Sequence, residues 1–94
     1  MDLGKAIKTI RKRKGIKQKE LANLCGISAN AMVSIEYNRT FPSKTTIRNI
    51  CDVLEVPVAY LLLLCLTDED IPENSKYLFN LLYEPMRKLL LKNI

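Results

Sequence analysis

The sequence contains no histidine and only three glycines. Without histidine, the chain cannot form a Ser-His-Asp triad or the usual histidine-containing zinc sites. With so few glycines, it has no glycine-rich loop that would hold a phosphate group. We therefore expect a protein that is not an enzyme and that uses no metal, no other cofactor and no small-molecule ligand.

Cysteine and long apolar runs are also scarce. The chain has three cysteines, an odd number, and they form no CxxC pair: Cys25, Cys51 and Cys65. This pattern excludes a disulfide scaffold and is typical of a protein in a reducing cytoplasm. The longest apolar run is nine residues, from Val58 to Leu66, whereas about 20 are needed to span a bilayer. The N-terminal residues show no secretory signal. These features predict a cytoplasmic protein with no membrane partner.

The 94 residues are enough for one domain with a short appendage, and 48% of them are hydrophobic. Charge is unevenly distributed along the chain. Residues 1–48 carry 11 Lys or Arg and 3 Asp or Glu, a net charge of +8, whereas residues 49–94 carry 4 and 7, a net charge of −3. This asymmetry favours a polyanionic partner for the first half alone.

Apolar residues recur at helical spacing from end to end, and strand signals are almost absent. The pattern predicts an all-α protein in which residues 1–66 form a first domain. Its helices are expected at about residues 3–14, 18–24 and 29–37, from Thr45 or Thr46 to Leu54, and from Pro57 onward. Ser28 is suited to cap the third of these helices.

Beyond this domain, residues 67–76 are polar and are expected to form a linker. A C-terminal helix is expected over residues 77–94, with Pro85 kinking or dividing it. Its apolar positions follow i, i+3, i+4 spacing, and they are Leu78, Leu81, Leu82, Met86, Leu89 and Leu90.

The segment from Gln18 to Glu36 has the pattern of a helix-turn-helix motif. Two short helical patterns meet at a three-residue turn that contains Gly26, where a left-handed backbone is expected. Ala22 is small enough to let the two helices cross closely, and Ile27 is expected to fill the angle between them. This arrangement holds the third helix outward, so that it can enter a DNA major groove.

With these residues, the sequence resembles the Cro/C1-type (XRE) helix-turn-helix family over residues 3–64, about two-thirds of the chain. The matching positions are Arg11, Gln18, Leu21, Ala22, Gly26, Ile27, Ser28, Ile35, Glu36, Pro42, Leu54, Val56, Leu61 and Leu62. The resemblance implies a five-helix, lambda-repressor-like DNA-binding domain followed here by a C-terminal helical extension. It also implies a sequence-specific transcriptional regulator of double-stranded DNA, most simply a repressor.

The resemblance also implies roles for individual residues. Arg11 and Glu36 are expected to form a structural ion pair, and Gln18 is expected to bind a phosphate. The outward positions of the third helix are expected to contact bases, and they are Ala29, Asn30, Val33 and Ser34. The residues expected at the DNA backbone are Gln18, Lys19, Tyr37, Asn38, Arg39, Thr40 and Lys44.

Two positions depart from the family pattern. Asn38 replaces the usual glycine after the third helix, and asparagine tolerates the left-handed backbone best after glycine. No cation lies between Gly26 and Asn38. This neutral helix favours an alternative function, a protein-interaction module of antitoxin or antirepressor type that uses the helix-turn-helix as a scaffold.

The apolar stripe of the C-terminal helix must be covered. Either this helix folds back on the fifth helix, or it pairs with the same helix of a second subunit. We expect the second arrangement, a homodimer, because helix-turn-helix proteins commonly read two half-sites about 34 Å apart.

Overall fold

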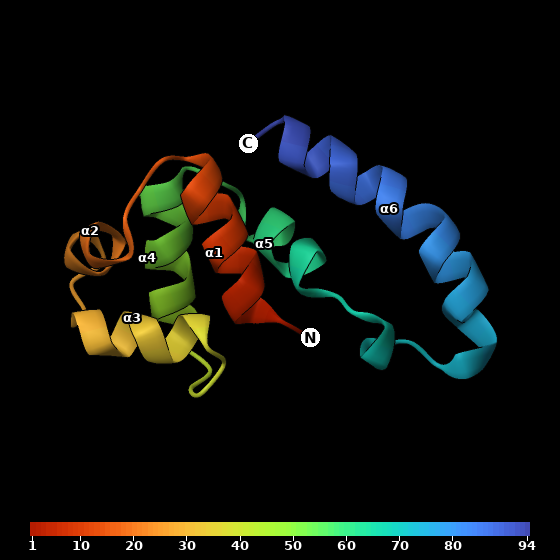
Figure 1. The fold of residues 1–94 in the computed structure, drawn as a ribbon, viewed down its shortest axis with the longest axis horizontal. Helices are drawn as coiled ribbons and strands as arrows, with labels where there is room; N and C mark the ends of the chain where they lie inside the picture. The colour runs from red at the N-terminus through yellow and green to blue at the C-terminus, as the bar shows by residue number, and fades with distance from the viewer.

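The computed structural model describes all 94 residues and contains helices but no strand. The helices are α1 (Leu3–Arg13), α2 (Gln18–Leu24), α3 (Ala29–Glu36), α4 (Lys44–Leu54), α5 (Val58–Cys65) and α6 (Lys76–Lys92). Helices α1 to α5 form one body, and α6 lies on the side of it opposite to α2 and α3 (Figure 1). The predicted all-α fold, a five-helix body with a C-terminal helical extension, is confirmed.

Side-chain caps fix where α1, α3 and α4 begin, and the cap of α1 is Asp2. The hydroxyl of Ser28 accepts a hydrogen bond from the backbone N–H of Ala31 at 3.0 Å, which confirms the predicted cap of α3. Ser43 accepts in the same way from the N–H of Thr46 at 3.2 Å. Because Ser43 is the cap, α4 begins at Lys44 and not at the predicted Thr45 or Thr46.

The first four helices end in the same motif. Each is followed by a residue in the left-handed conformation, with φ of 71° at Gly15, 72° at Gly26, 59° at Asn38 and 57° at Glu55. In each case the N–H of the next residue donates to the carbonyl oxygen five positions earlier, as in a Schellman motif. Two of these four positions therefore carry a side chain where glycine is the usual residue.

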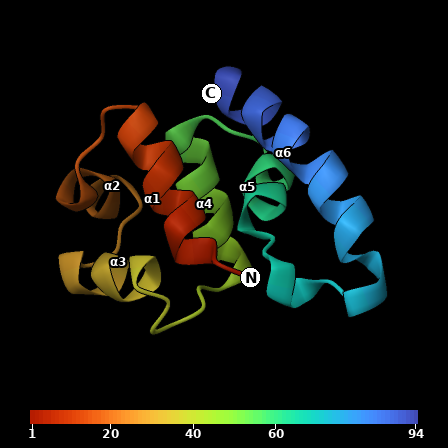
Figure 2. The ribbon, with the colours of Figure 1, turned by 45° about the vertical axis from the view of Figure 1, so that its right-hand side comes forward.

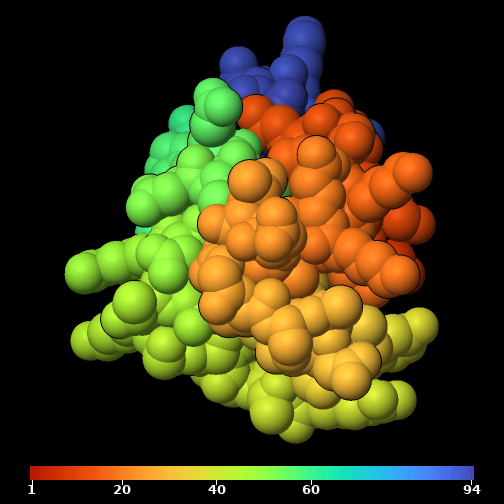
Figure 3. Space-filling view, turned by 90° about the vertical axis from the view of Figure 1, so that its left-hand side faces the viewer, coloured from red at the N-terminus to blue at the C-terminus, as the bar shows by residue number.

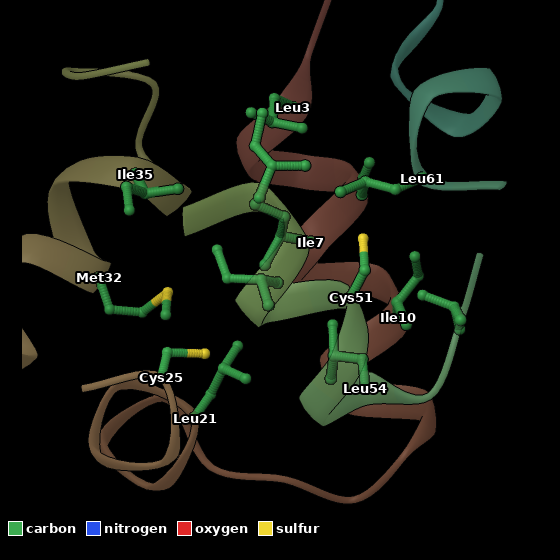
Figure 4. Close-up of a cluster of buried hydrophobic side chains, with 14 of the residues drawn as sticks. Leu3, Ile7, Ile10, Leu21, Cys25, Met32, Ile35, Cys51, Leu54 and Leu61 are labelled. Carbon is green, nitrogen blue, oxygen red and sulfur yellow. The ribbon is translucent and has the colours of Figure 1, made fainter. Parts of the chain in front are cut away.

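The core lies between α1 and the other four helices of the body. Figure 4 shows Ile7 and Ile10 of α1 directed toward side chains of α4, α5 and the helix-turn-helix. The largest fully buried side chains are Ile7, Ile10, Leu21, Met32, Ile50, Leu54, Leu61, Cys51 and Cys65. The helix-turn-helix is thus built into the core and is not an appendage to it.

All three cysteines are free and buried. Burial raises the pKa of Cys51 and of Cys65 to about 11, and burial also raises the pKa of Cys25. A thiol that stays protonated and buried is a poor nucleophile and a poor redox sensor. These side chains therefore act as small apolar residues of the core.

Helix α6 packs against α5 on one face (Figure 2). The rings of Phe79 and Tyr83 stack with their centroids 4.8 Å apart, and the Tyr83 hydroxyl donates to the Leu64 carbonyl oxygen at 3.3 Å. Two short 3-10 turns, Asp68–Asp70 and Glu73–Ser75, connect α5 to α6. Pro85 lies inside α6 without dividing it, contrary to one of the two outcomes expected for this residue.

Candidate nucleic-acid interface

Helices α2 and α3 meet at a tight corner. Ala22, at 1% exposure, allows the helices to approach closely, and the left-handed backbone at Gly26 turns the chain. The N–H of Ile27 donates to the Ala22 carbonyl oxygen at 3.0 Å, and the Ile27 side chain packs against the core. The corner therefore holds α3 in one orientation relative to the body.

The two sides of α3 differ sharply. Met32 and Ile35 are buried, which fixes the inward side. The four residues expected to contact bases all lie on the other side, in two adjacent rows at i, i+4 spacing. Of these, Ala29 and Asn30 are exposed and Val33 and Ser34 are half-buried. In the space-filling view, α2 and α3 lie side by side at the surface that faces the viewer (Figure 3).

A buried ion pair ties α1 to the end of α3. Arg11 and Glu36 are each 7% exposed. The Arg11 Nε donates to Glu36 Oε2 at 2.7 Å and its Nη2 donates to Glu36 Oε1 at 3.0 Å, while Nη1 donates to the Ile16 carbonyl oxygen at 2.9 Å. Such a bidentate pair, with further hydrogen bonds, has the geometry that a buried charge pair requires.

Gln18, the first residue of α2, belongs to the same network. Its Nε2 donates to Glu36 Oε1 at 3.2 Å, so the ion pair orients the side chain. Gln18, Val33 and Tyr37 line one hollow at the junction of α1, α2 and α3, together with Lys8. The expected role of Gln18 at a phosphate stays a prediction, and its half-buried side chain lies at the edge of this hollow.

The other residues expected at the DNA backbone lie at three places in the fold. Tyr37, Arg39 and Thr40 are exposed directly after α3, and the Arg39 guanidinium lies over the Tyr37 ring, 5.4 Å from its centroid. Lys19 is exposed on α2. Lys44 is exposed at the start of α4 and lines a different hollow, with Phe41, Arg48 and Leu62 among its neighbours.

Asn38 makes two side-chain contacts within the protein. Its backbone is left-handed as expected, and both polar atoms of its side chain are bonded to the start of α1, to Gly4 and Asp2. The residue is exposed, and its expected contact with the DNA backbone stays a prediction.

Three lysines of α1 border this face, and none of them is among the residues that the sequence assigned to the DNA backbone. Lys5, Lys8 and Lys12 line a hollow with Tyr37 and Asn38 at the end of α3. Their spacing of three and four residues places them on one side of α1, which is the signal that could have found them. The structure adds that this side of α1 borders α3.

The structure divides the apolar residues of α6 that were expected to form one stripe. Leu78, Leu81, Leu82 and Leu89 are 57–61% exposed. Met86 and Leu90 are half-buried, and Met86 lines an apolar hollow with Leu63, Phe79 and Tyr83. The aromatic pair of α6, Phe79 and Tyr83, which is not part of the predicted stripe, lies at the contact with α5. The role of the predicted leucines in dimerisation stays a prediction.

The chain contains no group of three or more His, Cys, Asp or Glu side chains arranged to bind a metal ion. No helix combines the length and the apolar character that crossing a membrane would require.

Comparison with known proteins agrees with this reading of the fold. A helix-turn-helix family model (HTH_3) matches residues 7–61, more than half of the chain. The structure is similar to the crystal structure of the clp gene regulator ClgR from Corynebacterium glutamicum, with a TM-score of 0.67 and 25% sequence identity over 94% of this chain and 86% of that one. No curated protein sequence matches the chain significantly.

Proposed function

Because the chain belongs to the XRE-type helix-turn-helix family and is a DNA-binding transcriptional regulator, we propose that it is a sequence-specific repressor that binds DNA as a homodimer. Occupying an operator is enough to block transcription, whereas activation needs a further contact with the polymerase. The similar ClgR structure, described as a gene regulator, supports a regulatory role. Binding of this kind needs no catalytic residue.

The outward face of α3 carries the proposal. It is held rigidly by the α2–α3 corner and by the Arg11–Glu36 pair, and its exposed residues are neutral. Asn30 can pair with adenine through its amide, and Ala29 and Val33 can contact thymine methyl groups. Ser34 can bond either a base edge or a phosphate. Since α3 offers no arginine or lysine to guanine, we expect it to prefer half-sites that contain A·T pairs.

Positive charge around α3 supplies the non-specific part of binding. Five exposed cations lie near the face: Lys8, Lys12, Lys19, Arg39 and Lys44. Neutral hydrogen-bond donors are offered by Gln18, Tyr37 and Thr40. Each phosphate contact releases counterions, so affinity should fall steeply with salt. These contacts orient the protein on the duplex but do not read its sequence.

The test begins with selection of bound sites from a random duplex library, followed by titrations with single variants. Asn30→Ala should cost about 1–3 kcal/mol at one base position and relax the preference there. Arg39→Ala should weaken binding to all sequences alike and flatten the salt dependence. Asn49→Ala, at an exposed asparagine of α4, is the matched control and should change neither. Selected sites dominated by G·C pairs under α3 would refute the assignment.

The homodimer rests on the second apolar face of α6. One face already covers α5, yet Leu78, Leu81, Leu82 and Leu89 remain exposed on the same helix. A helix that is apolar on two sides normally has two partners. A second copy of α6 can cover these leucines, and the dimer would carry the two α3 helices that reading two half-sites requires.

The dimer is tested by changing the exposed leucines alone. The double variant Leu78→Gln and Leu81→Gln should sediment as a monomer and should lose affinity for a two-half-site operator, while its affinity for one half-site is kept. Truncation after Thr67 should give the same result in light scattering. A truncated protein that remains dimeric, or a full-length protein that is monomeric at micromolar concentration, would exclude α6 as the dimerisation element.

The interaction-module alternative is favoured by one observation, the absence of any cation on α3 itself. Titration against random and selected duplexes at several salt concentrations separates the two functions. A repressor should show a steep salt dependence and an additional sequence-dependent affinity. A scaffold module should bind selected duplexes no more tightly than random ones.

A further inference from the structure

The start of α1 lies directly against the end of α3. Gly4 is buried, and a Cβ built on it would lie 2.6 Å from the carbonyl carbon of Glu36 and 2.7 Å from the carbonyl oxygen of Ile35. Only a residue without a side chain allows the two backbones to approach in this way. The N-terminal end of α1 thereby lies beside the C-terminal end of α3, and the opposite ends of two helix dipoles attract each other.

The side chain of Asn38 bridges this contact. Its Oδ1 accepts from the Gly4 N–H at 2.9 Å, and its Nδ2 donates to Asp2 Oδ1 at 2.7 Å. The same carboxylate oxygen caps α1 by accepting from the Lys5 N–H at 2.9 Å. The bond from Asn38 and the bond from Lys5 lower the pKa of Asp2, so the bridge is made to an ionised carboxylate.

The backbone at this position does not by itself require asparagine. Glycine adopts the left-handed conformation with less strain. At the end of α4, Glu55 adopts the same conformation, so this fold also accepts a residue other than asparagine or glycine at a left-handed position. What asparagine adds is the amide, which satisfies an otherwise unpartnered N–H of the first turn of α1. The two bonds join residues that are 34 and 36 positions apart in the sequence.

We propose that Asn38 is a positioning residue for the recognition helix: its side-chain amide fixes the orientation of α3 by tying the end of α3 to the start of α1. The effect that we expect on DNA recognition rests on the proposed DNA-binding function. Arg11 holds Glu36 at a second point, seven residues or about 10 Å further along α1. The α2–α3 corner and the buried side chains of Met32 and Ile35 hold the rest of α3, so the Asn38 amide sets the position of its C-terminal end.

Orientation matters because base contacts require accurate geometry, within about 0.5 Å and 10–20°. Asn30 and Ser34 lie on α3, and Tyr37 and Arg39 flank Asn38 itself. A change in the direction of α3 therefore moves the base-reading residues relative to the phosphate-binding residues. The expected consequence is a loss of discrimination between sequences, with a smaller loss of overall affinity.

The experiment compares Asn38→Gly with Glu55→Gly in the full-length chain. Both variants replace a side chain at a left-handed position with glycine, but no hydrogen bond is made by the Glu55 side chain. For each protein, binding is measured to the selected site and to the same site with one altered base pair. We expect Asn38→Gly to reduce the ratio of the two affinities by about 5- to 30-fold, which is comparable to losing the discrimination of one base contact. Glu55→Gly should leave the ratio unchanged.

Two results would overturn the inference. An unchanged ratio in Asn38→Gly would show that the amide does not set discrimination. Equal weakening at both sites with an unchanged salt dependence would show instead that Asn38 contacts a phosphate directly as a neutral donor.

A measurement without DNA separates this inference from the proposed function. Residual dipolar couplings of the free protein report the direction of α3 relative to α1. In Asn38→Gly the couplings of α3 should change as a group, and the pKa of the Asp2 carboxyl should rise toward its ordinary value. Unchanged couplings refute the positioning role even if the wild-type protein binds DNA as proposed. A wild-type protein without sequence preference refutes the proposed function, while the couplings still decide the role of Asn38.

Discussion

Replacing Gly4 by alanine is the sharpest test of how α1 and α3 are packed. In an ordinary helical position this change stabilises a protein by about 0.5–1 kcal/mol, because glycine loses more backbone entropy on folding. At Gly4 the new methyl group would lie 2.6 Å from the Glu36 carbonyl carbon, roughly 1 Å short of the usual separation of about 3.5 Å between non-bonded carbons. Both neighbours are backbone atoms, so no side chain can rotate away.

The expected result is therefore opposite in sign to the usual one. Overpacking of this kind costs about 1–3 kcal/mol, and the rigidity of the site places Gly4→Ala at the upper end, about 2–3 kcal/mol. For a chain of this size the melting temperature should fall by about 10–20 °C. The free energy of unfolding is measured by urea titration followed by far-ultraviolet circular dichroism.

Lys8→Ala, at an exposed position of the same helix, serves as the control and should change stability by no more than about 0.5 kcal/mol. The Gly4→Ala variant should also bind its selected DNA site more weakly, since α3 has to move for the methyl group to fit. A Gly4→Ala protein as stable as the wild type, or more stable, would show that α1 and α3 are not in backbone contact.

Two further predictions concern buried groups. Glu36→Leu leaves the Arg11 guanidinium buried without its carboxylate, so it should lower the free energy of unfolding in urea by about 3–5 kcal/mol. Adding Arg11→Met should recover most of this loss, and a single variant as stable as the double variant would contradict the pairing. Because burial raises the pKa of Cys51 and Cys65 to about 11, the unfolded chain loses these protons first as the pH rises above 9, so the free energy of unfolding should fall between about pH 9 and 11. The slope should be about 1.4 kcal/mol per pH unit for each thiol, and Cys51→Ala should remove its share; an unchanged slope in that variant would show that Cys51 does not contribute.

Much of the fold follows from local patterns in the sequence. Apolar residues at helical spacing predict the helices, and Ser28 predicts the start of α3, because capping and periodicity involve residues only a few positions apart. Gly26 and Ala22 predict the corner between α2 and α3 for the same reason, since a left-handed turn and a close crossing each demand a particular small residue. The family resemblance joins these local signals into one domain.

Only the tertiary structure decided which surfaces meet. Neither Gly4 nor Asn38 stands out locally as a contact residue, yet they are bonded across 34 positions, because α3 ends where α1 begins in space. In α6 several apolar sides are available, and the sequence pattern did not identify the one formed by Phe79 and Tyr83 that packs against α5. Periodicity states that a helix has an apolar side, but the choice of partner depends on shape and on distances between segments far apart in the chain, which no local pattern contains.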